Sequence, residues 1–153
     1  MSYNPKPLFD AARTTALKLG VFAKVNGHEP KNPPGQGMTL SMWLDELRPI
    51  PTSGLASTSA VLVLGARIQT PMIQEAQDAV EIGVAATAVA LVGGLHADLR
   101  AGGLLRTIDV FGGESGIRLE GKAGYLTHDQ KEYRVFTLRI PMVVNDVWAQ
   151  LTA

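Results

Sequence analysis

The sequence contains no cysteine among its 153 residues. Disulfide bonds, cysteine-ligated zinc and thiol nucleophiles are therefore excluded, and the composition is typical of a protein that assembles in a reducing cytoplasm. A domain of this length can bury roughly 70% of its unfolded surface, so its core needs neither a disulfide nor a metal. We expect one domain over residues 1–153, in which residues 1–7, with two prolines, form an extended arm.

An excess of charge of one sign is also missing, because 14 Lys and Arg residues balance 14 Asp and Glu residues. A nucleic-acid-binding protein ordinarily carries a basic excess, since release of counterions from the phosphates drives its affinity. The balance therefore indicates a protein that does not bind DNA tightly. A neutral wall past which DNA slides remains compatible with it.

Long hydrophobic runs are absent as well, whereas a membrane-spanning helix needs about 18 or more apolar residues in succession. The alanine-rich stretch from Ala85 to Leu95 is shorter than this and contains Thr87. The first residues, MSYNPKP, lack the basic and then apolar segments of a secretory signal. We expect no membrane association.

What the sequence does contain is 46% hydrophobic residues arranged with helical and strand periodicity. The expected helices cover residues 8–19 and a segment that begins with Thr70 as N-cap and Pro71 as first helical residue and ends at Gly93 and Gly94. The expected strands cover residues 21–26, 38–48, 59–69, 104–111, 117–127 and 132–144, and the second and third are expected to form a long antiparallel hairpin. This order of helix, three strands, helix and three strands predicts an α+β fold: a largely antiparallel sheet of about six strands with two main helices packed on it.

The segment NGHEPKNPPGQG, residues 26–37, places a histidine beside a glutamate. The zinc motif H-E-x-x-H needs two histidines one helical turn apart, but Asn32 stands where the second is required and Pro30 prevents the helix. A small metal-dependent hydrolase centred on His28 and Glu29 is therefore a minor alternative. We expect no bound metal and no cofactor.

Two further segments imitate catalytic motifs. Residues 116–123, GIRLEGKA, match a phosphate-binding loop except at Ala123, which has no hydroxyl for magnesium, and their alternation is typical of a strand. In GGESG, Ser115 stands one place too late for a nucleophile elbow, so the glycines are better interpreted as a hairpin turn. The adjacent carboxylates Asp45 and Glu46 are expected to point to opposite faces of a strand. No catalytic residue is predicted, and the protein is not expected to be an enzyme.

Six segments stand out in order along residues 21–148. They are HEPKNPPGQG, the strand that contains Trp43 and ends in RP, SGLASTSA, ARIQTPM followed by EAQDA, GKAGYL and RIPMVVNDVW. Together they resemble the tail terminator proteins of long, non-contractile-tailed phages, particularly phages of actinobacterial hosts. No single segment is a catalytic motif, so the specificity of the resemblance comes from the set and its order.

The resemblance implies a small α+β subunit of a homohexameric ring that caps the tail tube, stops its polymerisation and joins it to the head or neck. The implied partners are further copies of the chain, the tail tube protein and a head-completion or neck protein. DNA would pass through the lumen without specific binding, and the protein would be part of the virion after assembly in the host cytoplasm. Another neck or connector ring, or a tail-tube subunit, is the alternative.

A closed ring joins one surface patch to a different patch of the next copy. Segments already stiffened by proline lose less entropy on docking, which favours the segment that contains His28 as a contact strap. Tryptophans are common anchors of such contacts. The expected subunit-interface residues are His28, Glu29, Lys31, Pro33, Pro34, Trp43, Arg48, Asn145, Asp146 and Trp148.

Overall fold

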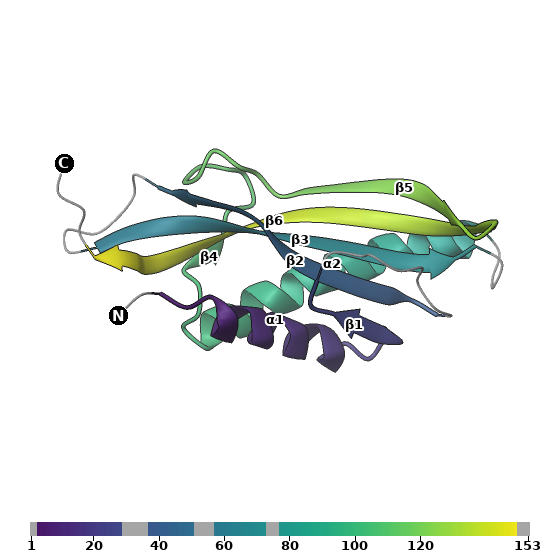
Figure 1. Cartoon of the computed structure of the whole chain (residues 1–153), viewed down its shortest axis with the longest axis horizontal. Helices are drawn as coiled ribbons and strands as arrows, with labels where there is room; N and C mark the ends of the chain where they lie inside the picture. Colours follow the sequence, from purple (N-terminus) through teal and green to yellow (C-terminus); the bar gives the residue numbers. More distant parts are fainter. Residues whose placement is uncertain (1–2, 29–36, 51–56, 73–76, 150–153) are drawn as a thin grey trace.

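A computed structural model describes residues 3–28, 37–50, 57–72 and 77–149 (Figure 1). It confirms the predicted order of helix, three strands, helix and three strands, and the α+β class. The elements are α1 (Lys6–Lys18), β1 (Lys24–Asn26), β2 (Thr39–Pro49), β3 (Ser57–Pro71), α2 (Gln77–Ala101), β4 (Thr107–Ile108), β5 (Glu120–His128) and β6 (Lys131–Ala149).

The strands form one mixed sheet in the order β1-β2-β3-β6, with β4 and β5 both paired to the far side of β6. The predicted hairpin of β2 and β3 is confirmed, and β3–β6, β4–β6 and β5–β6 are antiparallel too. Only β1, which pairs in parallel with the start of β2, departs from this pattern in the described part of the chain. The sheet is long and strongly twisted, with both helices on one of its faces (Figure 1).

The main core lies between this face and the two helices. Alternate residues of the strands point into it, as the period of two requires, and meet the buried stripes of α1 and α2. Its fully buried larger members on the described elements are Leu8, Leu40, Met42, Leu64, Ile68, Leu91, Leu95, Leu99, Ile140 and Met142.

The prediction that Gly93 and Gly94 end the second helix is wrong, because α2 continues to Ala101. Each glycine costs about 1 kcal/mol relative to alanine inside a helix. The buried stripe resumes at Leu95 and Leu99, however, and burying a leucine side chain contributes roughly 1.5–3 kcal/mol. Packing therefore outweighs the local preference.

The predicted start of that helix at Thr70 and Pro71 is also wrong. Both residues belong to the end of β3, where they pair with Arg134 and Tyr133 of β6. Proline lacks the amide that a central ladder needs, and it is tolerated here because Pro71 is the last residue of the strand. Helix α2 is described from Gln77 onwards.

Other boundaries shift as well. Residues 104–111 give only the two-residue β4, and β1 is shorter than predicted, whereas β5 starts three residues later than expected. Strand β6 continues beyond residue 144 through the segment NDVWA. The expected arm is shorter than seven residues because α1 already begins at Lys6.

The opposite face of the sheet carries a second, smaller core cluster. Ile117, from the segment between β4 and β5, covers Val61 and Val63 of β3 and Val143 of β6, with Ile50 beside them. Asp109 holds this covering segment, because its Oδ2 accepts hydrogen bonds from the amide of Glu114 and from the amide and hydroxyl of Ser115, at 2.7–3.1 Å. Ser115 is thus a structural hydrogen-bond donor to Asp109.

Candidate subunit interface

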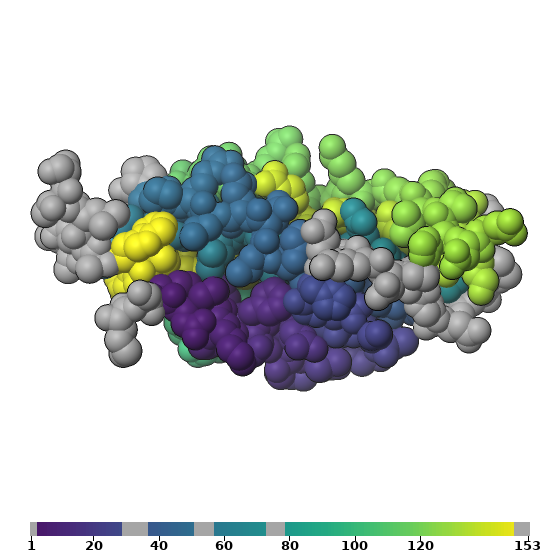
Figure 2. All heavy atoms as spheres, viewed as in Figure 1, coloured from purple at the N-terminus to yellow at the C-terminus, as the bar shows by residue number. Residues whose placement is uncertain are grey.

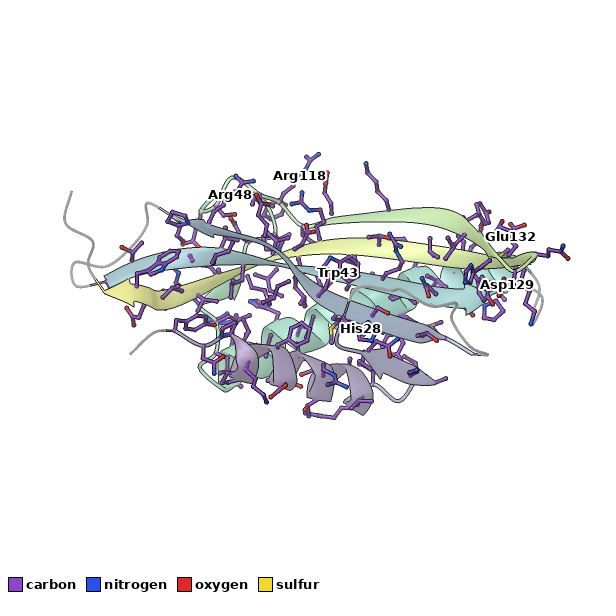
Figure 3. All side chains as sticks on the ribbon, in the orientation of Figure 1. His28, Trp43, Arg48, Arg118, Asp129 and Glu132 are labelled. Atoms are coloured by element: carbon purple, nitrogen blue, oxygen red, sulfur yellow. The ribbon has the colours of Figure 1, made fainter. Side chains whose placement is uncertain are left out.

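His28 is exposed and lies two residues after the end of β1, close to α1 (Figure 3). It is the last described residue before the gap at 29–36. Glu29, Lys31, Pro33 and Pro34 lie outside the described residues, so the strap they were expected to form remains a prediction.

Trp43 lies on the face of the sheet opposite the helices, in the middle of β2 (Figure 3). It stands opposite Gly65 of β3, and a Cβ atom at Gly65 would fall 2.3–2.7 Å from three atoms of the indole ring. The indole therefore occupies the space over a residue without a side chain. This contact makes Trp43 half-buried within the subunit, with the remainder of the ring accessible.

Arg48 belongs to a cluster of four charged side chains on the same face. Its Nε donates to Glu46 at 2.6 Å, while Arg139 of β6 donates to Glu46 at 2.9 Å and to Asp45 at 3.3 Å. The prediction that Asp45 and Glu46 point to opposite faces is therefore wrong. A bulge between Leu44 and Glu46 inserts Asp45 as an extra residue, and both carboxylates reach the same guanidinium.

The charges of this cluster compensate one another. The hydrogen bond from Arg48, together with the positive charge of Arg139, holds the pKa of Glu46 below its usual value. Glu46 thus stays ionised at neutral pH. Two carboxylates and two guanidinium groups leave this part of the sheet without net charge.

Asn145, Asp146 and Trp148 lie at the distal end of β6. Asp146 adopts a left-handed backbone conformation with φ of 60°, at a second bulge where β6 shifts register against β3. Its carboxylate accepts a hydrogen bond from the Ser57 hydroxyl, and Asn145 accepts one from Ser59 at 3.3 Å. Trp148 packs against the main core and is half-buried, so part of its side chain already contacts its own subunit.

The expected interface residues are therefore not gathered in one patch. Trp43 and Arg48 share the outer face of β2. Asn145, Asp146 and Trp148 lie on β6, which β2 and β3 separate from β1 and His28 in the sheet. Sequence reasoning missed Arg139, which organises the acidic pair. One signal was available: the alternation of Leu40, Met42 and Leu44 resumes at Leu47, three residues on, and that change of phase marks the bulge.

Besides the outer edges of the short strands β1 and β4, two longer strand edges have no strand beside them within the described part of the subunit. Strand β2 pairs with β1 only at residues 39–41, so its stretch from Met42 to Pro49 has β3 on one side and no strand on the other. Strand β5 pairs with β6 alone. The two free edges lie on opposite sides of the sheet and toward opposite ends of the molecule, where Figure 2 shows β2 in blue and β5 in light green.

Exposed apolar side chains accompany these edges. On β2, Leu44 is 44% exposed and Leu47 is 51% exposed. Beside β5, α2 and the sheet enclose an open apolar groove of about 400 Å³. Its lining residues are Ala85, Ala88, Val89 and Val92 of α2 with Leu119, Gly121, Phe136 and Leu138.

Helix α2 is long and apolar enough to cross a membrane by length and composition alone. Its Val84, Leu91, Leu95 and Leu99 pack into the main core, as in the central helix of a globular domain. Within the described residues, no three His, Asp or Glu side chains gather as a metal site would require.

No family model matches the sequence, and no curated protein matches it. One solved structure with a similar chain is described as a virion of native gene transfer agent (GTA) particle. The two chains are 15% identical, and the similarity covers 90% of each with a TM-score of 0.37. A similarity this distant assigns no role to any residue of the present chain.

Proposed function

We propose that the protein is a structural component of a phage virion, a tail terminator that forms a homohexameric ring, and that it is not an enzyme. The ordered resemblance along residues 21–148 supports the family. The two free strand edges, on opposite sides of one sheet, are the observation that carries the ring. Different patches at opposite ends of a subunit generate head-to-tail contacts, which close into a ring when the rotation permits.

The strand directions suit such a contact. Because β2–β3, β3–β6 and β6–β5 are all antiparallel, β5 runs opposite to β2. A neighbouring copy's β2 placed beside β5 would therefore extend the sheet in the antiparallel sense. Closing the ring in this way would remove both free edges, which are otherwise templates for aggregation.

The two edges are also staggered along the sheet. Strand β5 lies level with the first part of β2, where β1 covers the edge, and the free part of β2 lies farther along. Strands that close into a barrel must tilt and stagger. In the proposed ring, the strands of every subunit would tilt against the ring axis by the same amount, so that the free part of each β2 meets the β5 of the next copy.

The mechanism of termination is geometric. One face of the ring would match the end of the tail tube, and the other face would offer no surface for a further tube subunit and would bind a head-completion or neck protein instead. The proposed lumen wall is the sheet face with the neutral cluster of Arg139, Asp45 and Glu46. DNA would pass such a wall without being held.

Native mass spectrometry and negative-stain microscopy of the purified protein, alone and mixed with tail tubes, test the proposal. We expect closed rings at tube ends and arrested growth of the tubes. Elongation of the tubes would instead identify a tail-tube subunit. A protein that stays monomeric and never occupies tube ends would contradict the ring.

A further inference from the structure

The groove beside β5 is lined by apolar side chains and one glycine. The ring of Phe136 is part of the lining and lies against Gly121 of β5, where a Cβ atom would be 2.6 Å from the ring. Leu119, and Val89 of α2, line the groove too, and Val89 is 75% exposed. A closely packed interior would fill such a space, so the open groove leaves apolar surface in water.

The outward face of α2 extends this apolar surface. No Asp, Glu, Lys or Arg occurs from Ile82 to Ala97, although the solvent side of a helix is usually charged. Ile82 is 71% exposed on this face, next in line to Val89. Large contiguous apolar patches on soluble proteins mark interaction sites.

The free edge of β2 carries side chains that complement the groove. Leu44 pairs with Leu64 of β3, and Leu47 pairs with Leu62. Both β3 residues point to the helix face of the sheet and into the main core. Leu44 and Leu47 therefore point to the helix face as well, at the rim where the sheet ends and their side chains remain exposed.

We propose that Leu44 and Leu47 of one copy dock into the groove of the next copy, which is formed by α2, β5 and β6. This inference rests on the proposed ring and specifies its contact. When the neighbour's β2 edge lies along β5, its helix face continues the helix face of the receiving subunit, where the groove opens. The exposed leucines and the exposed groove then cover each other.

Charge on the opposite face is compatible with the same arrangement. Lys122 of β5 points away from the helices, opposite Thr137, and has no carboxylate within 4 Å among the described residues. The neighbour's Asp45 and Glu46 would lie on that face of the joined sheet. Apolar groups would therefore meet on one face, and on the other Lys122 would lie on the same side as two carboxylates that Arg48 and Arg139 of their own subunit already contact.

Cysteine cross-linking tests the contact without background, because the chain contains no cysteine. The variant Leu47→Cys/Val89→Cys places one thiol on each side of the proposed contact. On oxidation of protein assembled alone or on tail tubes, we expect a ladder of covalent oligomers in denaturing gels. The matched control is Leu17→Cys/Val89→Cys, since Leu17 is a similarly exposed leucine on α1, and it is expected to stay uncross-linked.

The outcomes separate the inference from the proposed function. Rings that form normally while Leu47→Cys/Val89→Cys gives no more covalent oligomer than the control would overturn the docking contact and leave the terminator proposal intact. Wild-type protein that neither forms rings nor caps tubes would overturn the terminator proposal itself. A ladder that depends on Leu47→Cys would support both.

A second variant tests the same contact without cysteines. Leu44→Asp/Leu47→Asp puts two charges against the apolar groove, and we expect at least a tenfold loss of ring or capping affinity with an unchanged circular dichroism spectrum and Tm. The control Leu17→Asp changes an exposed leucine outside the contact and is expected to assemble as wild type. Normal assembly of the double variant would contradict the proposal.

Discussion

At the scale of single residues, the contact between Trp43 and Gly65 shows how a cross-strand neighbour determines which side chain fits. Glycine inside a strand loses entropy on folding and contributes no packing, so it usually marks a place where another group approaches closely. Here the approaching group is the indole ring. The sequence shows the glycine within its predicted strand, but the identity of the ring over it depends on register, which sequence periodicity does not give.

Replacing Gly65→Ala is expected to destabilise the fold by about 1–3 kcal/mol, because the new methyl group would overlap the indole and force it to move. Urea unfolding monitored by circular dichroism gives the free energy of unfolding. In the background Trp43→Ala, the same substitution is expected to cost much less, since the overlapping ring is gone. An equal cost in both backgrounds would show that the strain does not come from Trp43.

At the scale of elements, the segment between β4 and β5 depends on one carboxylate. Burial alone would raise the pKa of Asp109, but hydrogen bonds from the hydroxyl and amide of Ser115 and from neighbouring amides outweigh it and lower the pKa. The segment they hold places Ile117 over the second core cluster. The carboxylate of Asp109 thus holds in place the segment whose Ile117 packs on the valines of the second core cluster.

Removal of this carboxylate with Asp109→Ala is expected to cost about 2 kcal/mol, because amide donors in the segment lose their acceptor. The matched variant Ser115→Ala deletes one donor and leaves the amide bonds, so a smaller loss is expected. Thermal unfolding at pH 7 compares them. A larger loss for Ser115→Ala would contradict the assigned role of Asp109.

The pH dependence of stability gives a separate prediction. Because the pKa of Asp109 is lower in the folded protein than in the unfolded chain, where it is about 3.9, its ionised form stabilises the fold at pH values above about 4. This contribution is lost as the pH falls through the folded-state pKa. Between pH 7 and pH 3, the Tm of Asp109→Asn should therefore fall less than that of wild type. The control Asp10→Asn, which breaks an exposed ion pair with Lys6, should follow wild type.

The elements themselves were predictable wherever periodicity was strong. The order of helices and strands, the β2–β3 hairpin and the α+β class followed from it. The failures occurred where local chemistry competed with packing: Thr70 and Pro71 have the form of a helix start but end β3, and Gly93 and Gly94 have the form of a helix end but lie inside α2. Burial of residues far apart in sequence decided these cases.

At the scale of the whole molecule, less of the candidate interface was predictable. On the outer face of β2, Arg48 is exposed and Trp43 is half-buried, whereas Trp148 packs partly against the main core. The free edges and the groove beside β5 could not be predicted, because they depend on which strands remain unpaired and on how α2 lies over the sheet. Such features belong to the assembled fold and to no single segment.

The neutral cluster of Asp45, Glu46, Arg48 and Arg139 leads to a prediction about DNA. Wild-type protein is expected to show no measurable binding to duplex DNA at physiological salt, because Arg139 and Arg48 are engaged by Asp45 and Glu46. The variant Asp45→Asn/Glu46→Gln removes both carboxylate charges and frees two guanidinium groups on the same face. We expect weak, sequence-independent binding whose affinity falls with salt, with a log–log slope of about −2 for two phosphates. Fluorescence anisotropy of labelled DNA at several salt concentrations measures it.

The matched control is Asp10→Asn/Asp129→Asn, which changes the net charge by the same amount at two exposed positions away from the cluster. If both double variants bind DNA equally, net charge alone sets the interaction and the arrangement of the face has no part in it. If only Asp45→Asn/Glu46→Gln binds, compensation within the cluster is what keeps DNA from being held. In a ring, that binding would be repeated by every subunit around the lumen, so DNA transit would slow even though each free arginine contributes only one weak phosphate contact.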